Sequence, residues 1–402
     1  MAHAYDELTE ERLRKLDGAK WNHYDADILP MWVADMDFPI AEPIRQAIRD
    51  YAESDDFGYP MPSGIPGLMD AVTGHLDRTH GVRFSHEQVM MTSGIIPSLY
   101  LGTLALAGPG DEVIVQPPVY PPFSMAVTNT GRTLVENPMR VSEGRWELDL
   151  DNLEEVITPA TRMLILCNPQ NPTGRVFTRA ELEALGEVVL RHNLWVMSDE
   201  LHADLVLDGK HVPFAAVSPE LAERTITLFG PTKTFNIAGL KIGFALSHNE
   251  QLLGRLRNQA SGVLTSPNVL AQAAARAALT EAADWHSESL SYLKANRDMM
   301  ADFIARELPA VRMYVPEGTY LAWLDFSSVI PADQLEHFLH SECHVGLNVG
   351  DSYGTGGHGF ARINFATGRQ LLVEGLRRLK EGLDARMSTI LAAGEPVGEP
   401  VA

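Results

Sequence analysis

Several features are scarce in this sequence of 402 residues, and each scarcity excludes a class of protein. Only two cysteines are present, Cys167 and Cys343, far apart and without a C-x-x-C spacing, so neither a disulfide framework nor a zinc site is indicated. Basic residues are also few, because 32 Lys and Arg stand against 53 Asp and Glu, for a net charge of -21. This balance argues against nucleic acid or an anionic membrane as a partner, so local groups must hold any anionic ligand.

Long apolar runs are absent as well. The longest mostly apolar stretch, Gly94–Ala107, is interrupted by Pro97 and falls short of the roughly 20 residues that span a bilayer, so we expect a buried helix. The N-terminus is acidic and lacks the basic start and apolar stretch of a secretory signal. These absences predict a protein of the reducing cytoplasm, with no membrane partner and no metal.

The apolar residues that are present, 45% of the chain, can bury two unequal cores. Between about Val89 and Ser247, short apolar runs alternate with amphipathic stretches, the pattern of parallel strands joined by covering helices. We expect one helix to open near Ile95 and another at Arg179–His192, where Thr178 and Glu181 suit a capping box. The expected strands are Val89–Thr92, Glu112–Gln116, Arg162–Cys167, Leu194–Ser198, Thr225–Phe229 and Lys241–Leu246.

The C-terminal third predicts a separate α+β unit. After Pro267, one helical pattern runs to about Ala283, and a second, Ser287–Leu308, is long enough to leave the first domain. Further strands are expected at Arg312–Val315, Tyr320–Asp325 and Ala361–Phe365, with helices at Pro331–Ser341 and Arg369–Met387. We therefore expect a large domain at 46–285, a small domain at 286–390 joined by the N-terminal segment 1–45, and a disordered tail at 391–402.

A single lysine follows the expected strand Thr225–Phe229, in the run Gly230-Pro-Thr-Lys233-Thr-Phe-Asn. In an open parallel sheet, ligands gather beyond the carboxyl ends of the strands. Lysine is the amine that forms a Schiff base with an aldehyde cofactor. A solvated loop lysine is the alternative, and the more common case for a lysine taken alone. Polar residues at the other strand ends favour the cofactor.

Two of those strand ends carry groups that suit an aldehyde cofactor with a pyridine ring. Asp199 follows Leu194–Ser198, and a carboxylate there would keep the ring nitrogen protonated, so that the ring can accept electrons from a carbanion. A helix N-cap is an equally common use of an aspartate. Asn171 lies in Asn168-Pro-Gln-Asn171-Pro-Thr-Gly174, whose two Asn-Pro steps favour a rigid turn. Its amide could donate to a phenolic oxygen, unless the turn is purely structural.

The remaining strand ends predict a phosphate site and a stacking ring. The strand Val89–Thr92 leads through Ser93-Gly94-Ile95-Ile96 into a helix, so backbone N–H groups and the helix dipole point at the strand end. Lys241 could add a positive charge to the same phosphate. Tyr120, inside Pro-Pro-Val-Tyr-Pro-Pro, could stack on the ring or be a core tyrosine.

Four segments carry a resemblance to known enzymes: Met31-Trp-Val-Ala-Asp-Met-Asp-Phe38, Gly58-Tyr-Pro60, Ser198-Asp-Glu-Leu-His202 and Lys233-Thr-Phe-Asn-Ile-Ala-Gly-Leu240. With the residues above, they resemble the fold-type I aminotransferase superfamily of pyridoxal 5′-phosphate enzymes over nearly the whole chain. Within it they look like the cystathionine β-lyase group typified by MalY and PatB. The resemblance implies an α/β fold with a mostly parallel seven-stranded sheet covered by helices, a smaller α+β domain, and a homodimer with active sites at its interface.

The resemblance also implies roles for single residues. Lys233 would be the Schiff-base lysine, Asp199 the partner of the pyridinium nitrogen and Tyr120 the stacked ring. Tyr59 would reach the phosphate of the neighbouring subunit's cofactor. The other implied cofactor contacts are Asn171, His202, Gly94, Ile95, Ile96, Thr232 and Lys241.

The substrate side is implied in the same way. Arg362, in Phe360-Ala-Arg-Ile-Asn-Phe, matches the arginine that holds the substrate α-carboxylate, a task suited to its planar fork. Asn171 and Ala34 would lie beside that carboxylate. Tyr120, Tyr59 and Lys233 are the candidates for the proton donor to the leaving group.

Three positions depart from the wider superfamily. Gly230 stands where a serine is common, and Lys241 where an arginine is common, so we expect weaker phosphate binding unless Thr232 supplies a hydroxyl. His202 stands where many transaminases have a tyrosine beside the phenolic oxygen, which the lyase group tolerates.

The leading hypothesis is a carbon–sulfur β-lyase that converts cystathionine or another cysteine S-conjugate to a thiol, pyruvate and ammonia. In this reaction Lys233 removes the α-proton and a thiolate leaves the β-carbon. An aminotransferase would use the same residues, and a regulatory protein could keep the cofactor without turnover. A release of pyruvate without added keto acid would separate the first two hypotheses.

Overall fold

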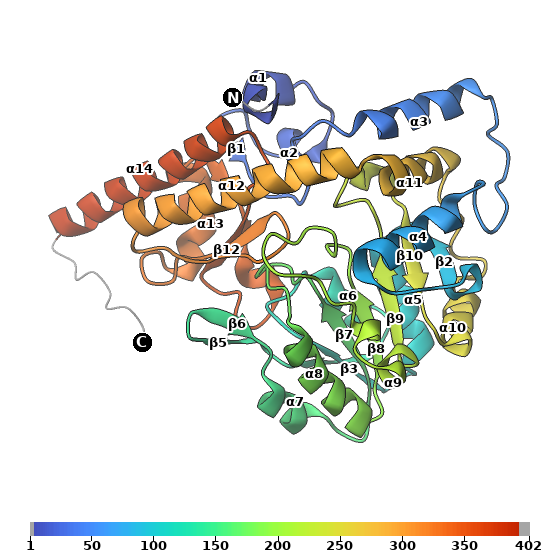
Figure 1. Ribbon diagram of the computed structural model, residues 1–402. Coiled ribbons are helices and arrows are strands. Elements are labelled where there is room, and N and C mark those ends of the chain that lie inside the picture. The colour runs from blue at the N-terminus through green and yellow to red at the C-terminus, as the bar shows by residue number, and fades with distance from the viewer. Residues whose placement is uncertain (1–3, 394–402) are drawn as a thin grey trace.

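The computed structural model describes residues 4–393, and the side chains of residues 4–388. The predicted tail at 391–402 lies outside these residues from 394 onward, while residues 391–393 end helix α14 (Arg369–Ala393). Figure 1 shows two sheet-containing parts joined by the long helix α12 (Ala283–Glu307). No helix among the described residues is both long enough and apolar enough to cross a membrane.

The large sheet has seven strands in the order β2-β10-β9-β8-β7-β3-β4, and all its pairings are parallel except the two made by β10. The prediction of a mostly parallel seven-stranded sheet is confirmed. All six expected strands lie in it, and β4 is an addition. The strands are β2 (Val89–Thr92), β3 (Glu112–Val115), β4 (Thr133–Glu136), β7 (Thr161–Cys167), β8 (Trp195–Asp199), β9 (Thr225–Phe229) and β10 (Gly243–Leu246).

Strand β10 corrects the expected Lys241–Leu246 in two ways. It runs antiparallel to both of its neighbours, and it begins two residues later, because Lys241 has a φ of 56°, a left-handed conformation that cannot continue a strand. A reversed strand starts at the edge where parallel strands end. The reversal therefore places Lys241 at the carboxyl edge of the sheet.

Helices cover both faces of the large sheet because successive strand residues point to opposite sides. On β3, Val113 and Val115 pack toward α5 (Ile95–Leu106), α6 (Pro122–Thr128) and α10 (Glu250–Ala260), while Ile114 packs on the opposite face. The helix predicted near Ile95 and the one at 179–192 are both present. The opposite face carries α3 (Glu42–Glu53), α4 (Leu68–His80), α7 (Leu150–Val156), α8 (Arg179–Arg191), α9 (Pro219–Ala222) and α11 (Val269–Glu281).

The capping box at the start of α8 is confirmed. The hydroxyl oxygen of Thr178 accepts from the Glu181 backbone N–H at 3.3 Å, and the Glu181 carboxylate accepts from the Thr178 backbone N–H at 2.7 Å. Each side chain satisfies a backbone donor that the helix itself leaves free.

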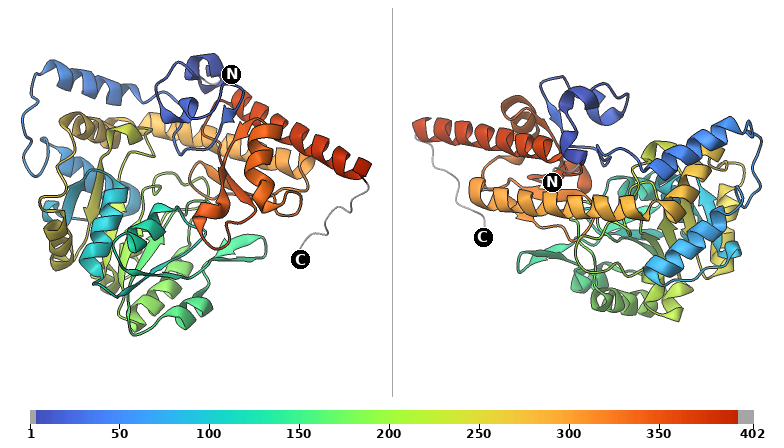
Figure 2. Two further views of the ribbon diagram at one scale, coloured as in Figure 1. Left: turned by 180° about the vertical axis from the view of Figure 1, so that it is seen from behind. Right: turned by 45° about the horizontal axis from the view of Figure 1, so that its top comes forward.

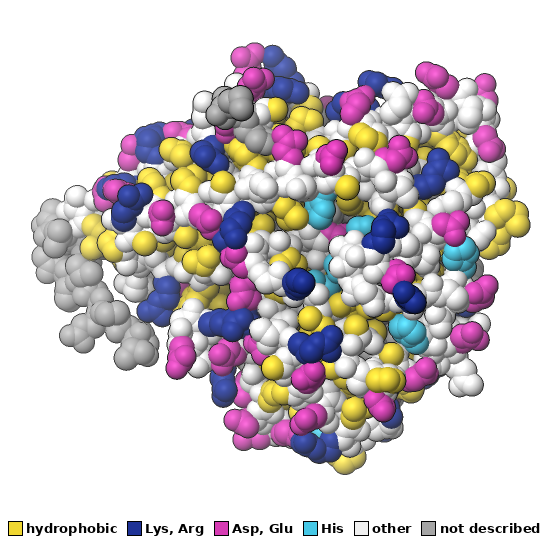
Figure 3. All heavy atoms as spheres, in the orientation of Figure 1, with side chains coloured by type: hydrophobic (Ala, Val, Ile, Leu, Met, Phe, Trp, Pro, Cys, Tyr) yellow, Lys and Arg dark blue, Asp and Glu magenta, His cyan; other side chains and the backbone are white. Residues whose placement is uncertain are grey.

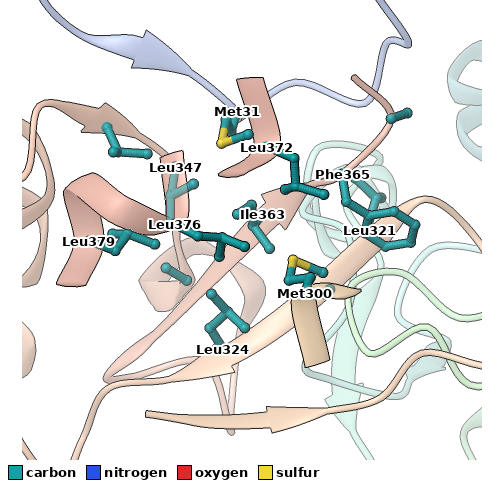
Figure 4. Packing of buried hydrophobic residues seen from close by; sticks show 14 of the residues in the cluster. Met31, Met300, Leu321, Leu324, Leu347, Ile363, Phe365, Leu372, Leu376 and Leu379 are labelled. Carbon is teal, nitrogen blue, oxygen red and sulfur yellow. The ribbon is translucent and has the colours of Figure 1, made fainter. Parts of the chain in front are cut away.

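The smaller sheet is antiparallel, in the order β11-β12-β15-β14, with bounds Arg312–Tyr314, Leu321–Asp325, Phe360–Asn364 and Asn348–Val349. Its apolar face packs on α12 and α14, as the buried side chains around Met300, Leu324 and Leu376 show (Figure 4). The helix expected at 331–341 is broken into a 3₁₀ turn, the short α13 (Leu335–His337) and a π-turn at Phe338–Glu342.

The N-terminal segment packs with this smaller part. It contains a 3₁₀ turn (Ala4–Glu7), α1 (Glu10–Leu13), α2 (Ala19–Asn22) and β1 (Leu29–Pro30), which pairs with β13 (Val345–Gly346). Its buried Leu8, Trp21 and Met31 belong to the same core as β12 and β15. The two views of Figure 2 show α12 crossing from the large sheet to this core, so the limit proposed at residues 285 and 286 falls within one helix. The exact domain limits stay a prediction.

Candidate active site

A cavity of about 590 Å³ lies at the carboxyl edge of the large sheet. Twelve of the thirteen site residues expected from the sequence line it. They are Ala34, Gly94, Ile95, Ile96, Tyr120, Asn171, Asp199, His202, Thr232, Lys233, Lys241 and Arg362. The strand ends therefore converge as the parallel pattern predicts.

Tyr59 is the exception. It does not line the cavity, and its side chain is fully exposed in a loop where Phe57 and Met61 are exposed too. Its expected contact is with the cofactor phosphate of a neighbouring subunit, so the role of Tyr59 stays a prediction.

Asp199 is the last residue of β8 and is 8% exposed. One carboxylate oxygen accepts from the Leu201 backbone N–H at 3.0 Å, which secures the following turn. Burial raises its pKa to about 7, the negative charge of Glu200 adds to this, and the positive charge of Lys233 opposes it. A cation beside this buried carboxyl would stabilise its ionised form, and a protonated ring nitrogen would be such a cation.

Arg362 is held from two sides in strand β15. Its Nη1 donates to the side-chain oxygen of Asn171 at 3.0 Å, and its Nη2 donates to the Trp32 carbonyl at 3.0 Å. The ring of Tyr353 lies 5.5 Å from the guanidinium carbon, within reach of a cation–π contact. Its Nε is buried and bonds to none of residues 4–393, so this nitrogen remains available to an anionic ligand. The side-chain NH₂ of Asn171 also bonds to no other described residue.

Lys233 lies in the loop after β9, and its side chain keeps 21% of its surface exposed. The amine donates to the Ala34 carbonyl at 2.6 Å, and the nearest carboxylate oxygen, on Asp35, is 4.0 Å away. Burial lowers the pKa of Lys233; Asp35 and Asp199 oppose this shift, and Arg362 adds to it. The neutral, nucleophilic form of the amine is thereby favoured relative to an exposed lysine.

The segment that supplies the Ala34 carbonyl has no regular structure, yet it is tightly held. From Trp32 to Phe38, every backbone carbonyl except that of Asp37 accepts a hydrogen bond from a side chain. Asn236, from the lysine loop, binds Met36 and Phe38, while Asn364, from β15, binds Val33 and Asp35. Side chains thus replace the hydrogen bonds that a helix or strand would provide.

Asn236, Asn364 and Tyr320 were not predicted as site residues from the sequence. The hydroxyl of Tyr320 donates to the Ala34 carbonyl at 2.8 Å. An asparagine inside the expected strand Ala361–Phe365 was a usable signal, because a buried amide needs partners. The partners themselves lie more than 190 residues away along the chain, so no local pattern could name them.

The opposite end of the cavity suits an anion. Helix α5 begins at Ile95 with Gly94 at a φ of 125°, and no side chain of the described residues caps its first turn. Its backbone N–H groups are therefore free to bind a phosphate. Thr232 and Lys241 line the same cavity. A Cβ atom at Gly230 would lie 3.3 Å from the Ile242 carbonyl oxygen, which gives a steric reason for glycine where the superfamily commonly has serine.

Two aromatic side chains complete the cavity. Burial raises the pKa of Tyr120, so its hydroxyl stays protonated, and the backbone N–H of Tyr120 donates to the Asn171 carbonyl at 3.1 Å. Burial lowers the pKa of His202 to about 3, helped by the positive charges of Lys233 and Arg362, so the imidazole is neutral. The Nδ1 atom of His202 is buried and has no partner in the part of the chain that the structure describes.

These free groups test whether pyridoxal 5′-phosphate suits the site. The cavity offers an amine, a buried carboxylate, an uncapped helix N-terminus, an aromatic ring and unbonded polar atoms on His202, Arg362 and Asn171. An aldehyde, a ring nitrogen, a phosphate and a phenolic oxygen would each find a matching group. The residues present fit this cofactor.

A second polar cluster lies outside the cavity. The Nε2 atoms of His75 and His80 lie 2.7–3.1 Å from the carboxylate oxygens of Asp204, close enough together to hold a metal ion. The same distances fit two imidazole N–H groups that each donate to one buried carboxylate. Hydrogen bonding therefore accounts for the cluster without an ion.

The sequence is similar to those of known proteins over nearly its whole length. The sequence pattern of the family described as aminotransferase class I and II matches residues 26–379. The chain is 38% identical over 385 residues to cystathionine beta-lyase PatB of Bacillus subtilis (strain 168), covering 93% of this chain and 98% of that protein.

Two solved structures are similar over their full length. A PLP-bound putative aminotransferase from Clostridium difficile 630 has a TM-score of 0.91 at 34% identity, covering 95% of this chain and 100% of that one. A PLP-bound C-S lyase from Staphylococcus hominis, complexed with L-cycloserine, has a TM-score of 0.88 at 30% identity, covering 95% and 99%.

Proposed function

The chain belongs to the class I and II aminotransferase family, and on this premise we propose that it is a pyridoxal 5′-phosphate-dependent carbon–sulfur β-lyase. Its substrate is L-cystathionine or a related cysteine S-conjugate, and its products are a thiol, pyruvate and ammonia. The observation that carries the proposal is the similarity to a cystathionine β-lyase over nearly the whole of both chains, together with a cavity that contains Lys233, Asp199 and Arg362.

Different residues of the cavity would bind different parts of the cofactor. Lys233 would hold it as a Schiff base, Asp199 would pair with the ring nitrogen, and Tyr120 would stack on the ring. The first turn of α5, with Thr232 and Lys241, would bind the phosphate. When bound, the cofactor supplies an aldehyde that takes up the substrate amine and a ring that accepts electrons from the α-carbon.

The protein contributes orientation and proton transfer. Arg362 binds the substrate α-carboxylate through its free Nε and its planar fork, which fixes the α-carbon beside Lys233. Lys233 would remove the α-proton, because burial lowers the pKa of its amine and so favours the neutral form relative to an exposed lysine. The thiolate then leaves the β-carbon, and Tyr120, Tyr59 and Lys233 are the candidates for its proton donor.

An aminotransferase is the second candidate, favoured by the similarity to a putative aminotransferase structure. The two reactions share every residue named above until the fate of the α-carbon proton is decided. We therefore expect a single assay to separate them. The purified protein, loaded with cofactor and given L-cystathionine without keto acid, should release thiol and pyruvate continuously and in equal amounts. A single conversion of bound cofactor without thiol release would instead favour the aminotransferase.

Arg362→Lys is expected to raise KM for the S-conjugate by about 100-fold and to change kcat less. Lysine keeps the charge but lacks the planar fork whose separate nitrogens reach Asn171 and the Trp32 carbonyl and still present Nε to a carboxylate. Steady-state kinetics with varied substrate measure the effect, and Arg377→Lys on the exposed surface of α14 is the matched control. An unchanged KM in Arg362→Lys would remove this arginine from the substrate site.

The assembly and location follow from the same proposal. The exposed loop with Phe57, Tyr59 and Met61 is an apolar surface suited to a second copy of the chain, and Tyr59 would reach that copy's cofactor phosphate.

Acidic and basic side chains alternate over the face in Figure 3, with no large basic patch there. A cytoplasmic location agrees with two cysteines that are both buried and free.

A further inference from the structure

The Ala34 carbonyl oxygen accepts hydrogen bonds from two side chains, the amine of Lys233 and the buried hydroxyl of Tyr320. The Nζ atom of Lys233 lies 2.6 Å from the Ala34 carbonyl oxygen, and the hydroxyl oxygen of Tyr320 lies 2.8 Å from it. A carbonyl oxygen has two lone pairs, so it can accept both hydrogen bonds at once. One oxygen therefore links a lysine in the loop after β9 of the large sheet to the tyrosine that directly precedes β12 of the small sheet.

Tyr320 has no other evident task in the site. It is 1% exposed, does not line the cavity, and its hydroxyl bonds to no other described residue. Burial raises the pKa of Tyr320 well above its usual value; the charge of Asp35 adds to this and that of Arg362 opposes it. The hydroxyl therefore remains a donor across the pH range in which the lysine titrates.

The Ala34 carbonyl is well placed to receive the amine. Asn364 bonds to the carbonyls of Val33 and Asp35 on either side at 2.7 Å each, and Asn236 bonds to Met36. The neighbouring peptide groups are thus fixed. Among the described residues, only Tyr320 and Lys233 donate to the Ala34 carbonyl itself.

We propose that Tyr320 is a positioning residue for the free amine of Lys233. By bonding to the Ala34 carbonyl oxygen, it fixes where the amine waits after the substrate has displaced it from the cofactor. It also occupies one lone pair of that oxygen. This inference rests on the proposed function in one respect, the role of Lys233 as the cofactor-bound lysine.

The shared oxygen affects the protonation of the amine. A neutral amine that donates one N–H to Ala34 keeps its lone pair free to accept the α-proton. An ammonium gains more from a strong acceptor, and an oxygen already bonded to Tyr320 is a weaker one. The other charged groups around Lys233 are Asp35, Asp199 and Arg362, with His202 neutral. Tyr320 acts with Arg362, and against the two carboxylates, to disfavour the ammonium.

Tyr320→Phe tests the inference, because it keeps the ring and removes only the hydroxyl. We expect kcat to fall about tenfold with KM within about twofold, since the amine loses its fixed position. The acid limb of the kcat profile should move up by roughly half a pH unit, since the oxygen becomes a better acceptor for the ammonium. Asp35→Asn should move that limb in the opposite direction.

A second readout needs no turnover. In the cofactor-free protein, the pH dependence of Lys233 acetylation by acetic anhydride, read by peptide mass spectrometry, gives the pKa of the amine directly. That pKa should rise by roughly half a unit in Tyr320→Phe. Tyr314→Phe is the matched control, because Tyr314 is buried in the same sheet and its hydroxyl lies 3.4 Å from Arg312, away from the cavity.

The outcomes separate the inference from the proposed function. An unchanged Lys233 pKa in Tyr320→Phe, with or without a loss of activity, would overturn the positioning role. A protein that cleaves no S-conjugate but shows the shifted pKa would refute the lyase and leave the role of Tyr320 standing. Equal shifts in Tyr320→Phe and Tyr314→Phe would assign the effect to the fold and also overturn it.

Discussion

Lys233→Ala is expected to lower turnover by at least about 1,000-fold, because the substitution removes both the covalent attachment of the cofactor and the base for the α-proton. Arg362, Asp199 and the α5 N-terminus remain, so the variant can still bind cofactor without a covalent bond. Borohydride reduction followed by mass spectrometry should add the cofactor mass at position 233 in the unaltered protein and nowhere in the variant.

Lys241→Ala is the matched control for this experiment. It removes a lysine from the same cavity, and it should weaken cofactor affinity while leaving the covalent adduct at Lys233. If Lys233→Ala retained turnover and a reducible adduct, the assignment of the cofactor lysine would be wrong.

Asp199→Asn is expected to have two opposite effects. Turnover should fall by about 100-fold or more, because an amide cannot hold the ring nitrogen in its protonated form. The cofactor-free protein should become more stable at pH 8, because burial raises the pKa of this carboxyl from 3.8 to about 7. At about 1.4 kcal/mol per pKa unit, the ionised carboxylate costs up to about 4 kcal/mol of folding free energy.

The sign of that effect depends on pH. The fold binds the Asp199 proton more tightly than the unfolded chain does, so the cost is absent below about pH 4 and complete above about pH 7. Urea unfolding of the cofactor-free protein should therefore show a gain for Asp199→Asn at pH 8 that shrinks toward pH 5. The Asn side-chain oxygen can still accept from Leu201, so the turn is kept. A gain of equal size at both pH values would contradict the assignment to ionisation.

The strand ends were predictable because apolar runs of four to seven residues mark buried parallel strands, and their carboxyl ends meet at one edge. The structure brings Asp199, Asn171 and Lys233 together at that edge, and their roles stay predictions. The direction of β10 was not predictable, because an apolar run reads the same in both directions. Lys241 reaches the cavity for a reason that differs from the expected one, since it precedes a reversed strand.

Other parts of the site had no local signal. The segment from Trp32 to Phe38 shows neither a helical nor a strand period, and its conformation depends on amides of Asn236 and Asn364 that are distant in sequence. The sequence around Tyr59 likewise did not predict that its side chain would be exposed. The broken helix at 332–342 shows that an amphipathic pattern does not specify which helical hydrogen-bond register each turn adopts.

Because the segment from Trp32 to Phe38 is bound from both halves of the molecule, the reactivity of the enzyme depends on how these halves are positioned relative to each other. Asn236 belongs to one half of the molecule and Asn364 to the other, and the carbonyl that receives Lys233 lies between their attachment points. A hinge motion that separated the halves would break one set of these bonds and withdraw the acceptor from the amine. An open molecule would then be inactive, because the amine of Lys233 would be held in position only in the closed molecule.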